Sequence, residues 1–327
     1  MTMKKSLSAL FCAAALAACQ QQSADTGSTA ASGTPSSAPA AQHQIDGETV
    51  VIKTAQGDVT VPLNPERIAV YDNGMADNLN KLGVKIGLST NEVLVDYLKP
   101  VLKDAKKGGT LFEPDLEALN EYKPQLIIIG SRMAKAREQL EGIAPTVDMT
   151  ADTANMRASM EERIDALAKV FKKEAEAEKV KAEIEKAFAE AKAATAGKGK
   201  GLVLLVNGGK LSAFGPTSRL GGWLHNDLAI PPVDESIKEG SHGQPVSFEY
   251  VKEKNPDWLF VLDRTAAIGE EGQAAKDVLD NPLVAETTAW KKGQVVYLSP
   301  AVYLAAGGAQ QMIDSANQVK AAFDKAK

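Results

Sequence analysis

Residues 115–132 read DLEALNEYKPQLIIIGSR, and residues 247–264 repeat the same pattern as SFEYVKEKNPDWLFVLDR. Both copies predict an acidic amphipathic helix that ends before a proline and is followed by an apolar strand. Arg132 and Arg264 each come eight residues after that proline. The repeat therefore predicts two similar α/β lobes, each with an arginine at the carboxyl end of a strand. Open α/β sheets bind ligands at that edge, which suggests a cleft between the lobes.

The amino terminus predicts export and a lipid anchor. Lys4 and Lys5 precede the short apolar run Leu7–Leu16, and the sequence LAAC forms a lipobox in which Cys19 would be acylated. An ordinary signal peptide with an incidental cysteine is the alternative, but the leucine and two alanines before the cysteine favour the lipoprotein. Gln20–Gln44 is rich in small and polar residues, which predicts a disordered tether.

Charge and cysteine content exclude several classes of protein. The net charge is −5, and it becomes more negative when Lys4 and Lys5 leave with the signal, which argues against nucleic acid as a partner. Of the two cysteines, Cys12 belongs to the signal and Cys19 would carry lipid. The mature body therefore has no disulfide and no thiolate metal site. After Cys19 no apolar run is long enough to span a bilayer.

Strand and helix patterns alternate after residue 48, which predicts two Rossmann-like α/β lobes joined by one long helix. Residues 154–196 contain no glycine or proline. They predict two helices side by side, one of which bridges the lobes; a solvated coiled coil is the alternative, but no heptad register continues through both. The predicted division is a signal peptide at 1–18, a lipidated cysteine and linker at 19–47, an N-terminal lobe at 48–153, an inter-lobe helix at 154–173 and a C-terminal lobe at 174–327.

Arginines at strand ends are the strongest candidates for ligand binding. Arg132 and Arg264 end the two repeats, and Arg219 ends a further strand–turn sequence, SAFGPTSR at 212–219. A single arginine more often forms a surface ion pair, but three at equivalent strand ends favour a site for a multiply charged anion. A guanidinium group suits such a ligand because it stays protonated and offers several donors in one plane.

His242 and Tyr303 are candidate metal ligands. His242 lies in a polar loop before the second repeat, and Tyr303 lies between the last strand and the last helix. Taken singly, the histidine would form loop hydrogen bonds and the tyrosine would pack. Together with the arginines, an imidazole and a phenol can complete the coordination of a ferric ion, which would favour the phenolate.

These residues resemble a known family. SAFGPTSR at 212–219, Gly240–Gly243, Asp263-Arg264 and Tyr303–Ala305 are similar to the ferric-siderophore-binding lipoproteins of the FatB/CeuE/FetB group, and FetB, a catecholate-siderophore binder, resembles the chain most. The members of that group are class III solute-binding proteins of ABC importers, with two α/β lobes joined by one long helix.

The resemblance implies roles for the candidate residues. Arg132, Arg219 and Arg264 would surround a trianionic, enterobactin-like iron catecholate in the cleft between the lobes. His242 and Tyr303 would bind iron directly where the siderophore leaves coordination sites open. Fe(III) would be carried as the siderophore complex, with no permanently bound cofactor.

The resemblance also implies partners. The protein would be a monomeric receptor, not an enzyme, held in the periplasm through the lipid on Cys19, and it would deliver its cargo to an inner-membrane ABC permease and its ATPase. Glu117 and Glu249, each seven residues before the proline of its repeat, match the glutamates with which this class docks to permease arginines. Helix stabilisation by an acid in the first turn is the alternative.

Other functions stay open. Another class III cargo, haem or cobalamin, is the nearest alternative, and haem could use Tyr303. A periplasmic enzyme or metallochaperone would need an acid–base pair, and the sequence has no HExxH, Walker or GxSxG motif. Three histidines in the whole chain argue against a multi-histidine zinc site. A surface adhesin or antigen with no small ligand is a further alternative, in which the paired arginines would be coincidental.

Overall fold

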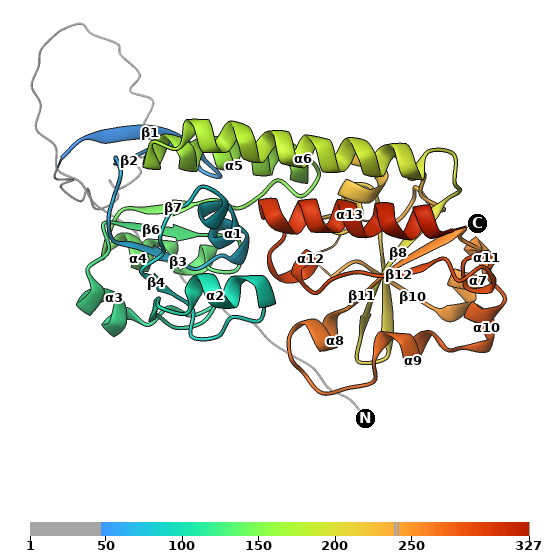
Figure 1. Ribbon diagram of the computed structural model, residues 1–327. Coiled ribbons are helices and arrows are strands. Elements are labelled where there is room, and N and C mark those ends of the chain that lie inside the picture. Colours follow the sequence, from blue (N-terminus) through green and yellow to red (C-terminus); the bar gives the residue numbers. More distant parts are fainter. Residues whose placement is uncertain (1–46, 239, 241, 327) are drawn as a thin grey trace, which may run out of the picture. The chain divides into compact units, whose positions relative to one another are not determined.

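The computed structural model describes residues 47–326 except 239 and 241 (Figure 1). The predicted signal peptide, Cys19 and the tether Gln20–Gln44 lie outside these described residues. Within the described part of the chain, no helix is both long and apolar enough to cross a membrane.

The first lobe is built on a parallel sheet of five strands. Their order is β5 (Lys106–Lys107), β4 (Leu88–Ser89), β3 (Ile68–Val70), β6 (Leu126–Ile129) and β7 (Thr146–Asp148), and every neighbouring pair is parallel. β3, β6 and β7 are buried along their whole length, as expected for parallel strands covered on both faces. The connecting helices are α1 (Asn73–Lys81), η1 (Asp96–Leu98), α2 (Lys99–Leu102), α3 (Leu116–Tyr122), η2 (Ala134–Ala136) and α4 (Arg137–Glu141).

The second lobe has a mixed sheet of five strands. Their order is β10 (Gln244–Val246), β9 (Lys210–Phe214), β8 (Gly201–Asn207), β11 (Trp258–Asp263) and β12 (Val295–Tyr297). β8, β11 and β12 are parallel, whereas β9 is antiparallel to β8 and β10. β9 reverses direction because Gly208 and Gly209, at φ 54° and 79°, form a two-residue hairpin turn. The helices are η3 (Trp223–Asp227), α7 (Phe248–Lys254), α8 (Arg264–Ala267), α9 (Ala275–Leu279), α10 (Pro282–Ala285), α11 (Thr288–Lys291), α12 (Ala301–Leu304) and α13 (Ala309–Lys325).

The repeated pattern folds twice in the same way. α3 begins at an Asp115 cap and α7 at a Ser247 cap, whose side chains accept backbone N–H groups at 3.0 and 3.3 Å. Both helices end on a residue in the left-handed region, Lys123 at φ 52° and Asn255 at φ 43°, directly before the proline. The following strands, β6 and β11, take the fourth place in their sheets. The predicted duplication of an α/β unit is confirmed.

Two adjacent helices, α5 (Met156–Phe171) and α6 (Glu174–Thr195), follow β7, with Lys172 in the left-handed conformation between them. Ion pairs between Lys181 and Asp165 (2.8 Å) and between Arg157 and Glu185 hold them side by side. α5 contacts β1 (Thr49–Thr54), α1 and η3, while α6 packs along α13 (Figure 1). α5 thus contacts elements of both lobes, and the division of the chain at 154–173 stays a prediction.

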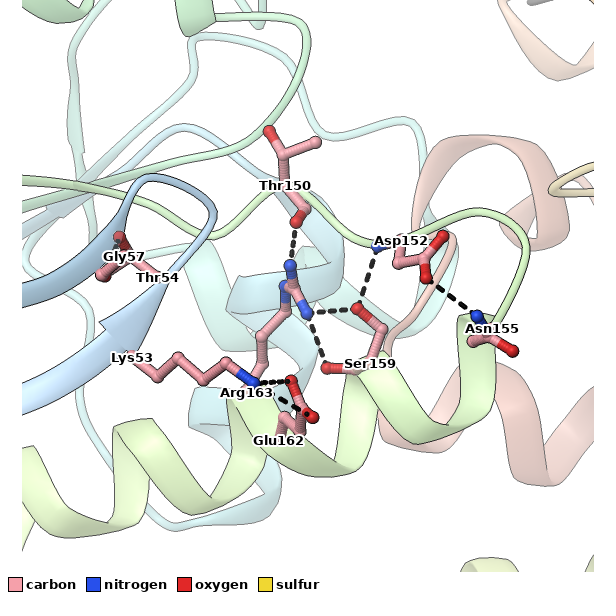
Figure 2. Close-up of polar contacts among 9 residues, drawn as sticks. All are labelled: Lys53, Thr54, Gly57, Thr150, Asp152, Asn155, Ser159, Glu162 and Arg163. Atoms are coloured by element: carbon pink, nitrogen blue, oxygen red, sulfur yellow. Dashed lines mark hydrogen bonds and ion pairs between the residues drawn. The ribbon is translucent and has the colours of Figure 1, made fainter.

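Arg163 of α5 fixes the segment that enters this helix from β7 (Figure 2). Its buried guanidinium donates hydrogen bonds to the carbonyls of Thr150 and, at 2.7 Å, Ser159. Lys53 of β1 pairs with Glu162 at 3.4 Å on the outer face of the same helix. β1 pairs with β2 (Gly57–Pro62) as an antiparallel hairpin, and its contacts with α5 tie this helix to the first lobe.

Candidate functional site

Three arginines surround the ring of Tyr303. The guanidinium carbons of Arg219, Arg132 and Arg264 lie 4.4, 5.7 and 5.8 Å from the ring centroid. Tyr303 belongs to α12, between β12 and α13, and its side chain is only 7% exposed. The structure therefore brings together four of the five predicted ligand-binding and metal-binding residues, which we call the arginine cluster.

Arg264 and Arg132 also donate hydrogen bonds to Tyr303. Arg264 Nε donates to the phenol oxygen at 3.1 Å, and its Nη1 donates to Asn207 Oδ1 at 3.0 Å, at the end of β8. Arg132 Nη2 donates to the backbone carbonyl of Tyr303 at 2.9 Å. Arg132 follows β6 in the first lobe, so this bond joins the two lobes at the cluster.

Arg219 reaches the cluster by a route that differs from the predicted one. Phe214, the last residue of β9, pairs with Val203 near the start of β8, whereas the end of β11 pairs with Val206. The prediction of three equivalent strand ends is therefore wrong for Arg219, because β9 is antiparallel. A turn after β9 carries the side chain instead, and Ser218 fixes it by donating from its hydroxyl to the Gly215 carbonyl at 2.6 Å.

The guanidinium of Arg219 is incompletely satisfied. Its Nε is buried and has no hydrogen-bond acceptor among the described residues. Burial lowers the pKa of Arg219; the adjacent Tyr303 opposes this effect, and the charges of Arg132 and Arg264 add to it. A buried donor without an acceptor is costly, and an anionic ligand that reached this nitrogen would supply the missing acceptor.

The cluster favours the ionised form of Tyr303. Burial raises the pKa of its phenol, but the hydrogen bond from Arg264 and the charge of Arg219 outweigh that effect and hold the pKa below its usual value. The other five tyrosines have raised pKa values, with burial as the largest cause: Tyr71, Tyr97, Tyr122, Tyr250 and Tyr297. The phenolate is the form that binds a hard metal ion.

We expect Tyr303 to be the first tyrosine to ionise as the pH of the ligand-free protein is raised. The phenolate absorbance in the ultraviolet should then increase in at least two steps. Tyr303→Phe should remove the first step and leave the later ones. Tyr297→Phe, at a half-exposed position with a raised pKa, should remove part of a later step only. A first step that survives in Tyr303→Phe would contradict the assignment.

Asp72 is the acidic neighbour of this cluster. Its carboxylate caps α1 by accepting the backbone N–H of Met75 at 3.0 Å, and it lies so near Gly130 that an added Cβ there would come within 2.3 Å of Oδ2. Burial raises the pKa of Asp72, and the charge of Arg132 offsets this only in part.

Polar side chains of α1 hold the segment after Tyr303, and the sequence analysis did not find them. Asn73 Nδ2 donates to the Leu304 carbonyl at 3.3 Å. Asn78 donates to the Gly307 carbonyl at 3.2 Å and accepts the backbone N–H of Ala309 at 2.8 Å. The amide pattern on α1 was visible, but it does not reveal a partner more than 200 residues away along the chain.

Asp77 makes the same connection at the start of α13. Its carboxylate accepts the backbone N–H groups of Gln310 and Gln311 at 3.1 and 3.0 Å and the Tyr97 hydroxyl at 2.8 Å. A carboxylate at a helix amino terminus satisfies free N–H groups there. Helix α1 of the first lobe thus helps to fix the loop that carries Tyr303 in the second.

His242 lies on an exposed turn before β10. Gln244 pairs with Ala213, so this turn lies beside the end of β9, from which the Arg219 turn departs. The predicted role of His242 in iron binding stays a prediction. Across residues 47–326, with 239 and 241 left aside, no three His, Cys, Asp or Glu side chains gather as a metal site.

Glu117 and Glu249 occupy equivalent exposed positions in the first turns of α3 and α7. The pKa of Glu249 is lowered by its own backbone N–H and by the Ser247 hydroxyl. The carboxylate is therefore stabilised in its charged form at the surface.

Comparison with known proteins identifies the family. Residues 68–302 match the family described as periplasmic binding protein. The chain is a periplasmic binding protein. It is 37% identical to the petrobactin-binding protein YclQ of Bacillus subtilis over 97% of both chains, and 32% identical to the ferric-anguibactin-binding protein FatB of Vibrio anguillarum over 76% of this chain and 79% of FatB.

Solved structures agree with this assignment. The YclQ structure superimposes with a TM-score of 0.82 at 36% identity, covering 85% of this periplasmic binding protein and 100% of YclQ. The catecholate-siderophore binding protein VctP of Vibrio cholerae gives a TM-score of 0.77 at 31% identity, covering 84% and 100%. The predicted class III fold is confirmed. These relatives are binding proteins, so the prediction of a receptor instead of an enzyme is confirmed as well.

Proposed function

We propose that this periplasmic binding protein captures a ferric siderophore of the catecholate type at the arginine cluster. The observation that carries the proposal is the convergence of Arg132, Arg219 and Arg264 on Tyr303. The names of YclQ, FatB and VctP, each of which refers to a siderophore, support the same class of cargo.

The charges of the cluster suit a multiply charged anion. Three guanidinium groups around one largely buried ring repel one another, and an iron complex with three catecholates carries three negative charges that would offset them. The catecholate oxygens are also acceptors for charge-assisted hydrogen bonds, including one from the unsatisfied Nε of Arg219. Haem and cobalamin carry no such concentration of negative charge.

Tyr303 and His242 would bind iron directly when the siderophore leaves some of the metal's coordination sites open. The lowered pKa of Tyr303 favours the phenolate as a direct ligand. His242, on the turn beside β9, would supply the other ligand. When the siderophore saturates the metal, Tyr303 would instead organise the arginines through its ring and phenol oxygen.

Delivery completes the proposed function. The lipid on Cys19 would hold the protein in the periplasm as a monomer, and the ABC permease and ATPase of the inner membrane would take up the cargo. Glu117 and Glu249 would contact the permease, one on each lobe.

A direct comparison of four ligands tests the choice of cargo. The protein that starts after the predicted tether is titrated with a ferric catecholate, a ferric hydroxamate, haem and cobalamin, and quenching of tryptophan fluorescence is followed. Trp223, buried four residues after Arg219, is the expected reporter. We expect the ferric catecholate to bind most tightly, because the oxygens around its iron carry a larger net negative charge than those of the other three ligands. Tighter binding of haem or cobalamin would refute the proposal.

A further inference from the structure

A cavity of about 380 Å³ lies next to the segment that carries Tyr303. Leu94, Leu111 and Phe112 of the first lobe line it, together with Leu304 of the second. Leu304 directly follows Tyr303, and Asn73, which also lines the cavity, donates its hydrogen bond to the Leu304 carbonyl. A residue of the cavity wall is therefore adjacent in sequence to Tyr303 of the arginine cluster, and both lobes contribute to the wall.

Its walls expose apolar side chains to solvent. Phe112 is 69% exposed and Leu94 is 37% exposed. Only four large hydrophobic side chains among the described residues are exposed to this degree, and two of them line this one cavity; the others are Val51 and Tyr297. A ligand that covers exposed apolar surface stabilises its complex by about 25 cal/mol per Å² of surface removed from water.

Hydrogen bonds hold Phe112 in this exposed position. The Thr110 hydroxyl oxygen accepts the backbone N–H groups of Phe112 and Glu113 at 3.2 and 3.0 Å, and Thr110 N–H donates to the Glu113 carbonyl at 2.8 Å. Asn91 Oδ1 accepts the N–H of Gly109 at 3.0 Å, just before this turn. The turn thus presents the phenyl ring from a fixed backbone, an arrangement that suits a contact surface for a ligand.

The chemistry of the cavity differs from that of the arginine cluster. Among the described residues that line it, Glu92 alone is charged, and no arginine or lysine is among them. An anionic iron centre would gain nothing there, and Glu92 would repel it. An uncharged, partly apolar organic group would bury the exposed faces of Phe112 and Leu94. The volume lies at the lower end of the range for ligand pockets, which fits part of a ligand.

We infer that this cavity is a second subsite, which takes the uncharged organic scaffold of the chelate while its anionic iron centre lies at the arginine cluster. The inference rests on the proposed function and deepens it. The cluster would recognise any ferric catecholate by charge, and the cavity would distinguish among such chelates by the scaffold that joins their catechol groups.

The test compares two ferric complexes that share an iron centre. One is formed with three separate catechol molecules, and the other with a single siderophore whose scaffold joins three catechols. Phe112→Ala should weaken binding of the scaffolded complex about tenfold, the loss expected for part of a buried phenyl ring. The same variant should leave the complex with simple catechol unchanged, because that ligand has nothing to place in the cavity.

Val51→Ala is the matched control, since Val51 is 56% exposed on β1 and does not line the cavity. It should change the affinity for neither complex. Equal losses for both complexes in Phe112→Ala, or no loss for either, would overturn the subsite alone. Failure of the unsubstituted protein to bind either complex would overturn the proposed function, and the subsite with it.

Discussion

Arg219→Ala is expected to weaken binding of a ferric catecholate by about 1–3 kcal/mol, the range for loss of a charge-assisted contact. Arg219 has the guanidinium nearest the Tyr303 ring, at 4.4 Å, and its buried Nε has no acceptor among the described residues. A bound catecholate oxygen would supply that acceptor. Because the ligand-free protein already bears the cost of the unsatisfied donor, the variant should be no less stable than the parent while its affinity falls. A fluorescence titration gives the affinity, and thermal unfolding gives the stability.

Two further variants distinguish the contribution of the Arg219 guanidinium to affinity from the contribution of net charge. Arg137→Ala removes one positive charge from α4, where Arg137 pairs with Glu141 at 3.0 Å. It should leave the affinity nearly unchanged. Arg219→Lys keeps the charge but loses the planar donors, so it should recover only part of the affinity. If Arg137→Ala lost as much affinity as Arg219→Ala, the loss would come from long-range charge and not from a direct contact with the ligand.

The duplicated unit could be predicted because its signals are local. A capping residue, an amphipathic helix, a proline and an apolar strand follow one another within eighteen residues in each copy. The structure has both units as predicted, and each helix ends on a left-handed residue before its proline, Lys123 in the first copy and Asn255 in the second. Arg132 and Arg264 follow from the same local order, since a residue after a parallel strand lies at the carboxyl edge of its sheet.

The approach of Arg219 could not be predicted in the same way. The glycines at 208 and 209 are typical of a turn after β8, but the edge at which the next strand ends depends on its direction in the sheet. The hairpin places the end of β9 opposite Val203, at the start of β8. Only the tertiary path of the turn around Ser218 brings the guanidinium back to Tyr303.

The contacts of α1 were invisible in the sequence for a related reason. Asn73, Asp77 and Asn78 lie on one short helix, yet the backbone groups that they bind lie between Leu304 and Gln311, up to 234 residues away. A buried polar side chain predicts that a partner exists, because an unpaired one would be costly. It does not say which backbone groups will meet it, since that depends on how two distant segments pack.

Replacement of both Glu117 and Glu249 by alanine is expected to abolish uptake of the ferric chelate by cells and to leave its affinity for the protein intact. The two carboxylates are exposed in the first turns of α3 and α7, at equivalent positions in the duplicated unit. Neither residue contacts the arginine cluster through any described interaction, so ligand binding has no reason to change. Each single variant keeps one contact with the permease and should retain part of the uptake, because the two lobes would dock separately.

The same helices provide a matched control for this prediction. Glu121 and Glu253 are also exposed, near the ends of α3 and α7. Glu121→Ala combined with Glu253→Ala removes the same charge from the same two helices but leaves their first turns unchanged. Uptake of radioactive iron, carried as the ferric chelate, should persist in that control and disappear in the Glu117→Ala, Glu249→Ala pair. Equal uptake by the two double variants would contradict docking through Glu117 and Glu249, and would leave the favourable position of an acid in a first helical turn as the reason for their placement.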